Sequence, residues 1–177
     1  MSLAGKSLEP TNLARIEKII NKFPNEDTIG VIDFTQPNTN YRFYIINNKN
    51  GQLIDNFRVA HGSGSGKGSM VERVSNKYGS LCTSVGVYRV GETYYGKYGK
   101  SLRLDGLEKG FNSNARMRAV VLHRSNYVTK TKVGHSWGCF AVDNSQFEEI
   151  FHLLENKKII IAYWPEPDWL KNSFYLK

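Results

Sequence analysis

The feature that most constrains the fold of this chain is a series of short apolar segments separated by residues that favour turns. In the first third, residues 29–34, 41–46 and 52–60 have the length and the β-branched and aromatic content that are typical of strands. Between the second and the third, residues 47–51 end in an Asn-Gly pair, which tolerates the positive φ of a tight hairpin turn. The first third is therefore predicted to form a β-meander.

The same pattern continues along the chain. Further strands are predicted at residues 85–90, 101–104, 119–123 and 158–163. The tyrosine-rich segment 91–100, interrupted by glycines, is typical of a twisted hairpin or a lid. Residues 106–114 contain too many glycines for a long helix, so turns or one short helix are expected there.

Two segments carry apolar residues at spacings of three and four, which is the period of an amphipathic helix. The first covers residues 11–23, where Thr11 or Asn12 can cap the start and a proline follows the end. The second covers residues 144–156, with an Asn or Ser cap. Regular structure is predicted to end at residues 164–167, which contain two prolines.

A chain of 177 residues is long enough to bury a core without disulfides or metals. Because the sequence shows no internal repeat and no second hydrophobic core, we predict one mainly β domain over residues 25–177. Residues 1–24 are predicted to form an N-terminal helix packed on that domain. The opening Met1-Ser2-Leu3 is followed by polar sequence, which we interpret as an expression remnant in place of a removed signal peptide.

The charge of the chain narrows the classes of partner. Its 24 Lys and Arg exceed its 16 Asp and Glu, and the formal net charge of +8 favours nucleic acid, a membrane surface or an acidic wall polymer. The basic residues are scattered and match no DNA- or RNA-binding pattern, so nucleic acid is the weaker hypothesis. No run approaches the roughly 18 apolar residues of a membrane span. The histidines show no zinc-helix spacing, so no metal is expected.

A cysteine and a histidine are the strongest candidates for chemistry. Cys139 follows a glycine and precedes an apolar run, and His123 ends the predicted strand 119–123. The polar loop between them can bring thiol and imidazole side by side, where the imidazole generates the nucleophilic thiolate. The loop carries no Asp or Glu, so we expect a backbone carbonyl just after His123 to fix the tautomer. A cysteine that only packs in the core is the alternative.

Three further features bear on this pair. Gly138 permits a tight turn, so that backbone N–H groups near Gly138 and Cys139 can point at an oxyanion. Cys82 is then a spectator, although the two cysteines could form a disulfide in an oxidising compartment. The glycine-rich segment 61–69 does not match a phosphate loop and is expected to form a loop at the mouth of a site. His61 begins it and could line a cleft, although a structural role is the more common one.

The residues around Cys139 resemble a known signature. His123, an intervening loop and Ser136-Trp137-Gly138-Cys139 resemble the motif of the L,D-transpeptidase (YkuD-type) catalytic domain. The likeness covers roughly residues 55–163, most of the chain, and favours the branch of murein L,D-transpeptidase catalytic domain family proteins. The segments that carry it are residues 84–88, 91–96, 101–108 and 136–139.

The resemblance implies a β-sandwich-like or barrel-like mixed sheet with a few peripheral α-helices, and a cysteine acyltransferase acting on peptidoglycan stem peptides. Cys139 would attack an L,D-peptide bond at meso-diaminopimelate and release D-alanine. An amine would then resolve the thioester into a cross-link, or water would resolve it as in a carboxypeptidase. His123 would act as base and then acid, amides near Gly138 and Cys139 would hold the oxyanion, and Ser136 would support them. No cofactor is implied, and a periplasmic or secreted monomer is expected.

Some positions depart from the family pattern. Trp137 stands where typical members have histidine, and Ala141 stands where they have arginine. Phe140 stands where the branch usually has proline. His135 is an alternative base, but its glycine-flanked loop fixes it less firmly than a strand fixes His123.

Because the usual arginine is absent, several residues are considered as candidates for binding the substrate. Arg103, Arg124 or Lys132 could replace the missing arginine, although each is also a typical solvated charge. Tyr94, Tyr95, Tyr98 and Trp137 are candidates for an aromatic wall, with ordinary packing as the alternative. The complete set of substrate-binding candidates is Trp137, His135, Arg124, Arg103, Tyr95 and His61. Two alternative functions are a cysteine amidase acting on another peptide and a non-catalytic module that binds the cell wall.

Overall fold

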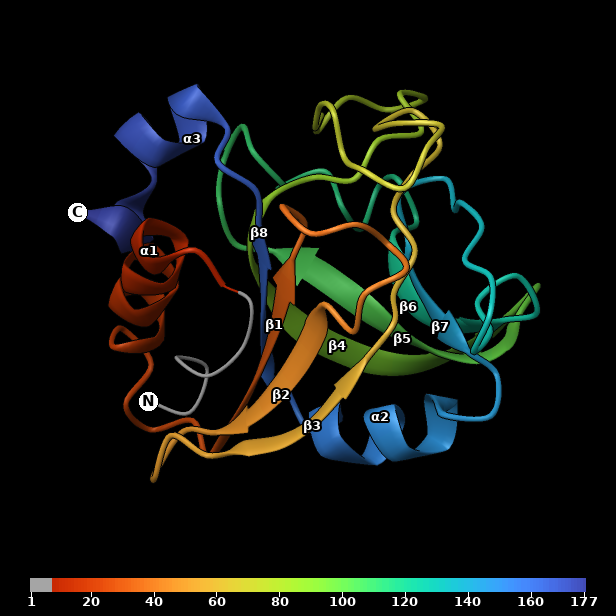
Figure 1. Cartoon of the computed structure of the whole chain (residues 1–177), viewed down its shortest axis with the longest axis horizontal. Helices are drawn as coiled ribbons and strands as arrows, with labels where there is room; N and C mark the ends of the chain where they lie inside the picture. The colour runs from red at the N-terminus through yellow and green to blue at the C-terminus, as the bar shows by residue number, and fades with distance from the viewer. Residues whose placement is uncertain (1–7) are drawn as a thin grey trace.

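The predicted strands form one mixed sheet in the computed structural model, which describes residues 8–177 (Figure 1). The strands are β1 (Thr28–Asp33), β2 (Phe43–Asn47), β3 (Leu53–Phe57), β4 (Gly86–Gly96), β5 (Gly99–Gly106), β6 (Val121–Ser125), β7 (Phe140–Asp143) and β8 (Ile159–Tyr163). The helices are α1 (Pro10–Ile20), α2 (Phe147–Leu154) and α3 (Pro167–Asn172), followed by the short 3-10 helix η2 (Phe174–Leu176). The expected mainly β fold is confirmed. Met1-Ser2-Leu3 lies outside the described residues.

The eight strands follow the order β3-β2-β1-β8-β4-β5-β6-β7. β1, β2 and β3 pair antiparallel in sequence order, which confirms the predicted β-meander. β8 lies in the middle of the sheet, where it pairs parallel with β1 and antiparallel with β4. It therefore joins the half of the sheet formed by β1–β3 to the half formed by β4–β7. At the edge of the second half, β6 and β7 pair in parallel.

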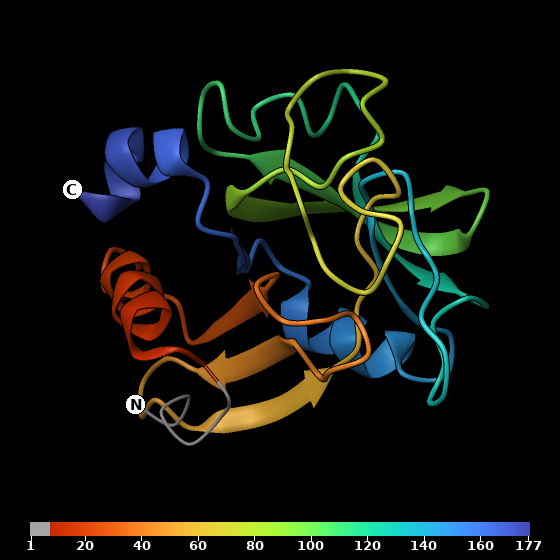
Figure 2. The same cartoon turned by 45° about the horizontal axis from the view of Figure 1, so that its top comes forward.

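Both faces of the sheet are buried, so the chain has two large apolar clusters where the sequence predicted one core. Successive side chains of a strand point to opposite faces. In β8, Ile160 enters one cluster, and Ile159 and Ile161 enter the other. α2 closes the first cluster, and α1 and α3 cover the second. Figures 1 and 2 show α1 and α3 together, well apart from α2.

The first two helices lie close to their predicted positions, but their caps differ. α1 begins at Pro10, and the carboxylate of Glu9 accepts a hydrogen bond from the amide of Asn12. Glu9 is therefore the N-cap, in place of Thr11 or Asn12. α2 begins after Gln146, whose side chain makes no capping bond, in place of the expected Asn or Ser cap.

A third helix begins where regular structure was predicted to end. Glu166 accepts a hydrogen bond from the amide of Trp169, and Pro167 occupies the first turn, where no N–H donor is needed. The indole of Trp169 is fully buried and donates to the carboxylate of Glu108, which also accepts from the hydroxyl of Ser173. The proline here starts a helix because a cap precedes it and a buried side chain follows it.

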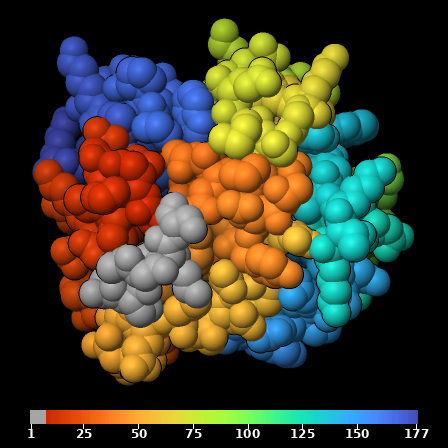
Figure 3. All heavy atoms as spheres, viewed as in Figure 1, coloured from red at the N-terminus to blue at the C-terminus, as the bar shows by residue number. Residues whose placement is uncertain are grey.

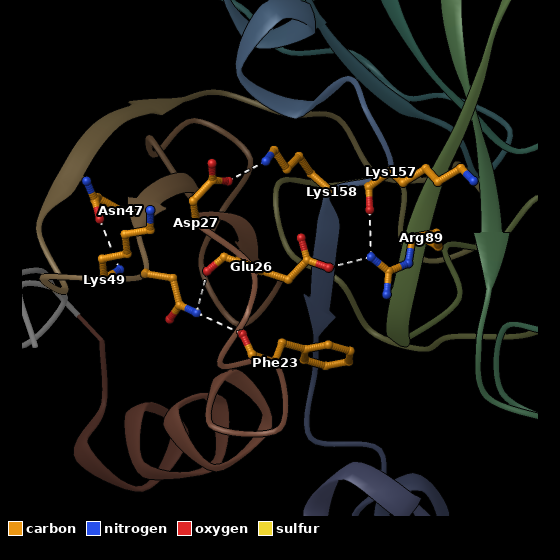
Figure 4. Close-up of polar contacts among 9 residues, drawn as sticks. Phe23, Glu26, Asp27, Asn47, Lys49, Arg89, Lys157 and Lys158 are labelled. Atoms are coloured by element: carbon orange, nitrogen blue, oxygen red, sulfur yellow. Dashed lines mark hydrogen bonds and ion pairs between the residues drawn. The ribbon is translucent and has the colours of Figure 1, made fainter.

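Ion pairs fasten the connection between α1 and β1 to the middle of the sheet (Figure 4). Glu26 pairs with Arg89 of β4, and Asp27 pairs with Lys158, directly before β8. Arg89 also donates to the carbonyl oxygen of Lys157 at 2.7 Å. The segment that follows the N-terminal helix is thereby anchored to β4 and to the start of β8.

The N-terminal helix shares an apolar cluster with the sheet, to which it contributes Ile16, Ile19 and Ile20. The boundary between residues 1–24 and 25–177 stays a prediction. Within residues 8–177, no helix is both long and apolar enough to cross a bilayer. The connection between β3 and β4 forms the upper right of the molecule in Figure 3, on the side of the sheet that carries β6 and β7 in Figure 1.

Candidate active site

His123 lies within β6, one strand in from the edge of the sheet. It pairs with Ser101 of β5 on one side and with Ala141 of β7 on the other. β6 continues to Ser125, two residues past the end predicted from the sequence, because these residues also pair with β7. Two ladders therefore hold the backbone of His123, and its side chain starts from a rigid position.

Cys139 directly precedes β7 and continues its register. Because Phe140 pairs with Leu122, Cys139 stands opposite Val121. Val121 and His123 are two residues apart, so their side chains share one face of β6. With strands about 4.8 Å apart and a rise of about 3.3 Å per residue, the Cα atoms of Cys139 and His123 are about 8 Å apart along the diagonal. Side chains that lean toward each other can meet across this separation.

Both side chains line one pocket of about 280 Å³. The candidates from the sequence that line it are Cys139, His123, Ser136, Trp137, His135, Tyr94 and Tyr98. Trp137 is 74% exposed and therefore stands at the mouth. The pocket thus brings together the proposed nucleophile, both candidate bases and part of the expected aromatic wall.

The imidazole of His123 is fixed in one tautomer. Its Nδ1 donates to the carbonyl oxygen of Arg124 at 2.8 Å, which is the carbonyl just after His123 that the sequence predicted. The ring of Tyr98 stacks on the imidazole, with the centroids 4.0 Å apart and the planes 11° apart. Burial lowers the pKa of His123, so the ring is neutral at pH 7 and its Nε2 carries a lone pair.

The thiol of Cys139 is protonated in this arrangement. Its Sγ donates to the carbonyl oxygen of Ala119 at 3.6 Å. Ala119 has a φ of 54°, a left-handed conformation that is strained for a residue with a Cβ. Burial raises the pKa of Cys139, while a backbone hydrogen bond from Val121 and the charge of Arg118 oppose this rise. The resting pair is therefore a thiol and a neutral imidazole.

Ser136 and Gly138 shape the turn before the thiol. Ser136 Oγ donates to the carbonyl oxygen of Cys139 at 2.7 Å and accepts from the amide of Gly138 at 3.1 Å. Gly138 has a φ of 112°, and a Cβ at this position would lie 2.6 Å from the carbonyl oxygen of Cys82. The Gly138 amide is thus already engaged, which leaves the Cys139 amide as the candidate oxyanion donor.

Several substrate-binding candidates lie outside the pocket. Adjacent residues of a strand face opposite sides, so Arg124 points away from the pocket and pairs with Glu148 of α2. Arg103 pairs with Glu92 at 3.3 Å. Tyr95 and Lys132 also lie outside the pocket, and both are exposed on the surface.

His61 is fully buried and does not line the pocket. Its Nδ1 accepts from the guanidinium of Arg42 at 3.0 Å, and its Nε2 donates to the carbonyl oxygen of Gly66 at 3.0 Å. Burial, followed by the charge of Arg42, lowers the pKa of His61 to about 4, so the ring is neutral. The ring packs edge-on against His135, with the centroids 5.0 Å apart. His61 therefore supports His135 and the glycine-rich segment 61–69.

Arg118 lines the pocket, although the sequence did not mark it as a site residue. Its guanidinium donates to the carbonyl oxygens of Ser75 at 3.0 Å and Cys82 at 2.6 Å, and to Ser80 Oγ at 3.3 Å. Arg118 belongs to no motif, and residues some forty positions earlier in the chain hold its side chain. The only local feature that could have marked Arg118 as a site residue was its position just before the strand that contains His123.

The two cysteines are both free thiols, so the alternative disulfide is not formed. The thiol of Cys82 is buried and donates to the carbonyl oxygen of Ser80 at 3.5 Å. Within residues 8–177, no group of three or more His, Cys, Asp or Glu side chains is placed to hold a metal ion.

Comparison of the sequence with models of known protein families identifies one matching family. The sequence model of the L,D-transpeptidase catalytic domain matches residues 4–163. No curated protein matches the chain. The helical cell shape determining protein Pgp2 from Campylobacter jejuni is similar in fold, with a TM-score of 0.53 at 13% identity over 85% of this chain and 55% of that one. An L,D-transpeptidase from Mycobacterium smegmatis has a TM-score of 0.49 at 11% identity, over 78% of this chain and 59% of that one. The chain therefore spans less than two thirds of the length of these solved structures.

Proposed function

Because this chain belongs to the L,D-transpeptidase catalytic domain family, we propose that it is a cysteine acyltransferase acting on peptidoglycan stem peptides. Cys139 is the nucleophile, and His123 is the general base and then the general acid. The observation that carries the proposal is the shared pocket, in which a neutral His123 of fixed tautomer lies on the same face as the thiol.

Acylation begins with the thiol and the neutral imidazole. His123 Nε2 takes the proton of Cys139 as the sulfur attacks the carbonyl carbon of an L,D-peptide bond at diaminopimelate. The carbonyl electron pair moves to the oxygen, which the Cys139 amide stabilises. Collapse of this intermediate expels the amine of D-alanine, which takes the proton from His123 and leaves a thioester. Because the resting thiol is neutral, proton transfer accompanies the attack.

The thioester has two fates. The amine of a second stem peptide attacks it to form a cross-link, or water attacks it in a carboxypeptidase reaction. In both cases His123 takes a proton from the attacking group and returns it to the departing sulfur, which restores the thiol. The neighbouring residues position this pair: Ser136 fixes the turn at Cys139 through its two hydrogen bonds, and Tyr98 supports the imidazole.

The location follows from the substrate. Peptidoglycan stem peptides lie outside the bacterial cytoplasm, so we place the protein in the periplasm or among secreted proteins. The stem peptides are its proposed partners, and the monomeric state stays a prediction. Trp137 at the mouth and His135 in the wall are the proposed contacts with the stem peptide.

Incubation with purified muropeptides, followed by mass spectrometry, tests the proposal and separates transfer from hydrolysis. Cys139→Ser is expected to abolish both reactions, and His123→Ala to slow them by about 100-fold or more. His135→Ala is the matched variant of the alternative base: it is expected to retain the reactivity of the Cys139 thiol, while loss of its contact with the stem peptide raises the KM for muropeptides. Abolition of thiol reactivity by His135→Ala, but not by His123→Ala, would show that the base is wrongly assigned.

A carbapenem probe distinguishes the alternative functions. A mass increase confined to Cys139 supports acyl-enzyme formation. An adduct without any turnover of muropeptides favours an amidase that acts on another peptide. If neither an adduct nor turnover of muropeptides is found, and the protein still binds cell wall, the result favours a non-catalytic binding module.

A further inference from the structure

The pocket around Cys139 has an unbalanced charge. Among the described residues that line it, Arg118 and Lys97 are cationic, and none is Asp or Glu. A cationic side chain that lines a pocket and has no carboxylate partner in the protein attracts anionic groups of a ligand. The lining therefore indicates that part of the ligand is negatively charged.

Arg118 is the better placed of the two cations. Lys97 is exposed at the tip of the β4–β5 hairpin, with its Nζ 5.7 Å from the centroid of the Tyr98 ring. Arg118 is half-buried, and its guanidinium is fixed by three hydrogen bonds to two carbonyl oxygens and one hydroxyl. A charge held in this way keeps its direction, whereas an exposed lysine is mobile and screened by salt.

The positive charge of Arg118 is not neutralised within residues 8–177. All three of its hydrogen-bond partners are uncharged, and no carboxylate lies within ion-pair distance of its guanidinium. Nearby Arg116 differs, because it pairs with both Glu92 and Asp105. Nη2 uses both of its N–H groups and Nη1 uses one, so the N–H of Nε and the second N–H of Nη1 are left for a ligand.

The guanidinium also lies close to the nucleophile. A Cβ added at Gly138, the residue before Cys139, would lie 3.1 Å from Nη2 of Arg118, the nitrogen that donates to Ser80 and Cys82, so the charge of the group lies beside the nucleophile. The charge of Arg118 also acts on the thiol of Cys139. In a peptide that ends one residue after the scissile bond, the terminal carboxylate is attached to the same Cα as the scissile nitrogen. Such a carboxylate lies next to the reacting carbonyl and thus within the region that Arg118 faces.

We propose that Arg118 binds the terminal carboxylate of the residue that leaves in the acylation step, and so selects stem peptides that end directly after the scissile bond. This assignment rests on the proposed function. It gives the pocket a substrate-binding cation in place of Arg103, Arg124 and Lys132, which lie outside it.

One test uses the thiol itself and does not depend on the natural substrate. Iodoacetate and iodoacetamide both alkylate Cys139 with loss of iodide, but only iodoacetate carries a carboxylate. Their second-order rate constants are measured at the Cys139 peptide by mass spectrometry, at low ionic strength. In Arg118→Gln the ratio of the iodoacetate rate to the iodoacetamide rate is expected to fall about tenfold, as for loss of one charge-assisted hydrogen bond.

Two further variants separate charge from structure. Arg118→Lys keeps a cation and is expected to retain most of the ratio. Arg116→Gln removes the same charge outside the pocket and is expected to change the ratio by less than about twofold. The proposal is overturned when both rates fall equally in Arg118→Gln, or when Arg116→Gln lowers the ratio as far as Arg118→Gln does.

A second test uses the wild-type protein and therefore does not require the variants to fold. A stem tetrapeptide with a free terminal carboxylate is compared with the same peptide carrying a terminal amide. The amide is expected to react with a kcat/KM about tenfold lower, mainly through KM. Equal values would overturn the role of Arg118. Turnover of neither peptide would refute the proposed function, and the alkylation ratio would still decide the role of Arg118.

Discussion

Gly138→Ala tests whether the turn before Cys139 requires glycine. The φ of 112° is a conformation that costs a residue with a side chain about 1–3 kcal/mol. The added Cβ would also lie 2.6 Å from the carbonyl oxygen of Cys82, so the backbone must move. Overpacking of this kind costs about 1–3 kcal/mol. The free energy of unfolding is therefore expected to decrease by about 2–6 kcal/mol.

A matched control separates the two contributions. Gly110 also has a positive φ, 85°, but a Cβ built there meets nothing within 4 Å. Gly110→Ala is therefore expected to cost only the conformational strain, about 1–2 kcal/mol. The excess cost of Gly138→Ala over Gly110→Ala measures the close approach to Cys82.

Urea unfolding of the wild type and both variants gives these free energies, provided that the slope with denaturant is unchanged. The alkylation rate of Cys139 by iodoacetamide is measured in parallel, because movement of the turn displaces the thiol. We expect Gly138→Ala to lower this rate and Gly110→Ala to leave it unchanged. A loss of stability no larger for Gly138→Ala than for Gly110→Ala would refute the reasoning.

Three other predictions follow from the protonation of buried groups. Burial raises the pKa of Cys139, so its alkylation rate is expected to increase about tenfold per pH unit between pH 6 and 8; a plateau below pH 7 would instead indicate a preformed thiolate. Burial and the charge of Arg42 lower the pKa of His61 to about 4, so below pH 6.5 the unfolded chain binds more protons than the folded protein. The free energy of unfolding should therefore decrease by up to about 3 kcal/mol from pH 7 to 4, and by less in His61→Gln, as measured by urea titration at each pH. Tyr98→Ala exposes His123 and should raise its pKa toward the ordinary value; an unchanged NMR titration of the ring would contradict this.

Local patterns in the sequence were sufficient for much of the fold. The β-meander depended on short apolar segments and one Asn-Gly turn, which are local properties. The carbonyl that orients His123 was also predictable, because the loop after it carries no Asp or Glu and a backbone carbonyl was the remaining acceptor. Alternation along β6 could have excluded Arg124 from the pocket, since it directly follows His123.

Other features depended on contacts between distant parts of the chain. The helix α3 is stabilised by burial of Trp169 against Glu108, sixty-one positions earlier, and the local prolines favoured an end of structure. Arg118 is directed into the pocket by residues 75–82, and no periodicity or motif reports such a contact. The sequence could identify the reacting pair but not the cation that lies beside it.

The position of β8 determines when the sheet can be completed during synthesis. The ribosome releases β1–β3 and then β4–β7, but the hydrogen bonds between these halves run through Ile159–Tyr163. Until that strand emerges, β1 and β4 each expose an unpaired edge, which can pair with strands of other nascent chains. His123 in β6 and Cys139 directly before β7 are thus synthesised before the sheet that supports them is continuous. Binding of chaperones to the exposed strand edges is most useful in this interval.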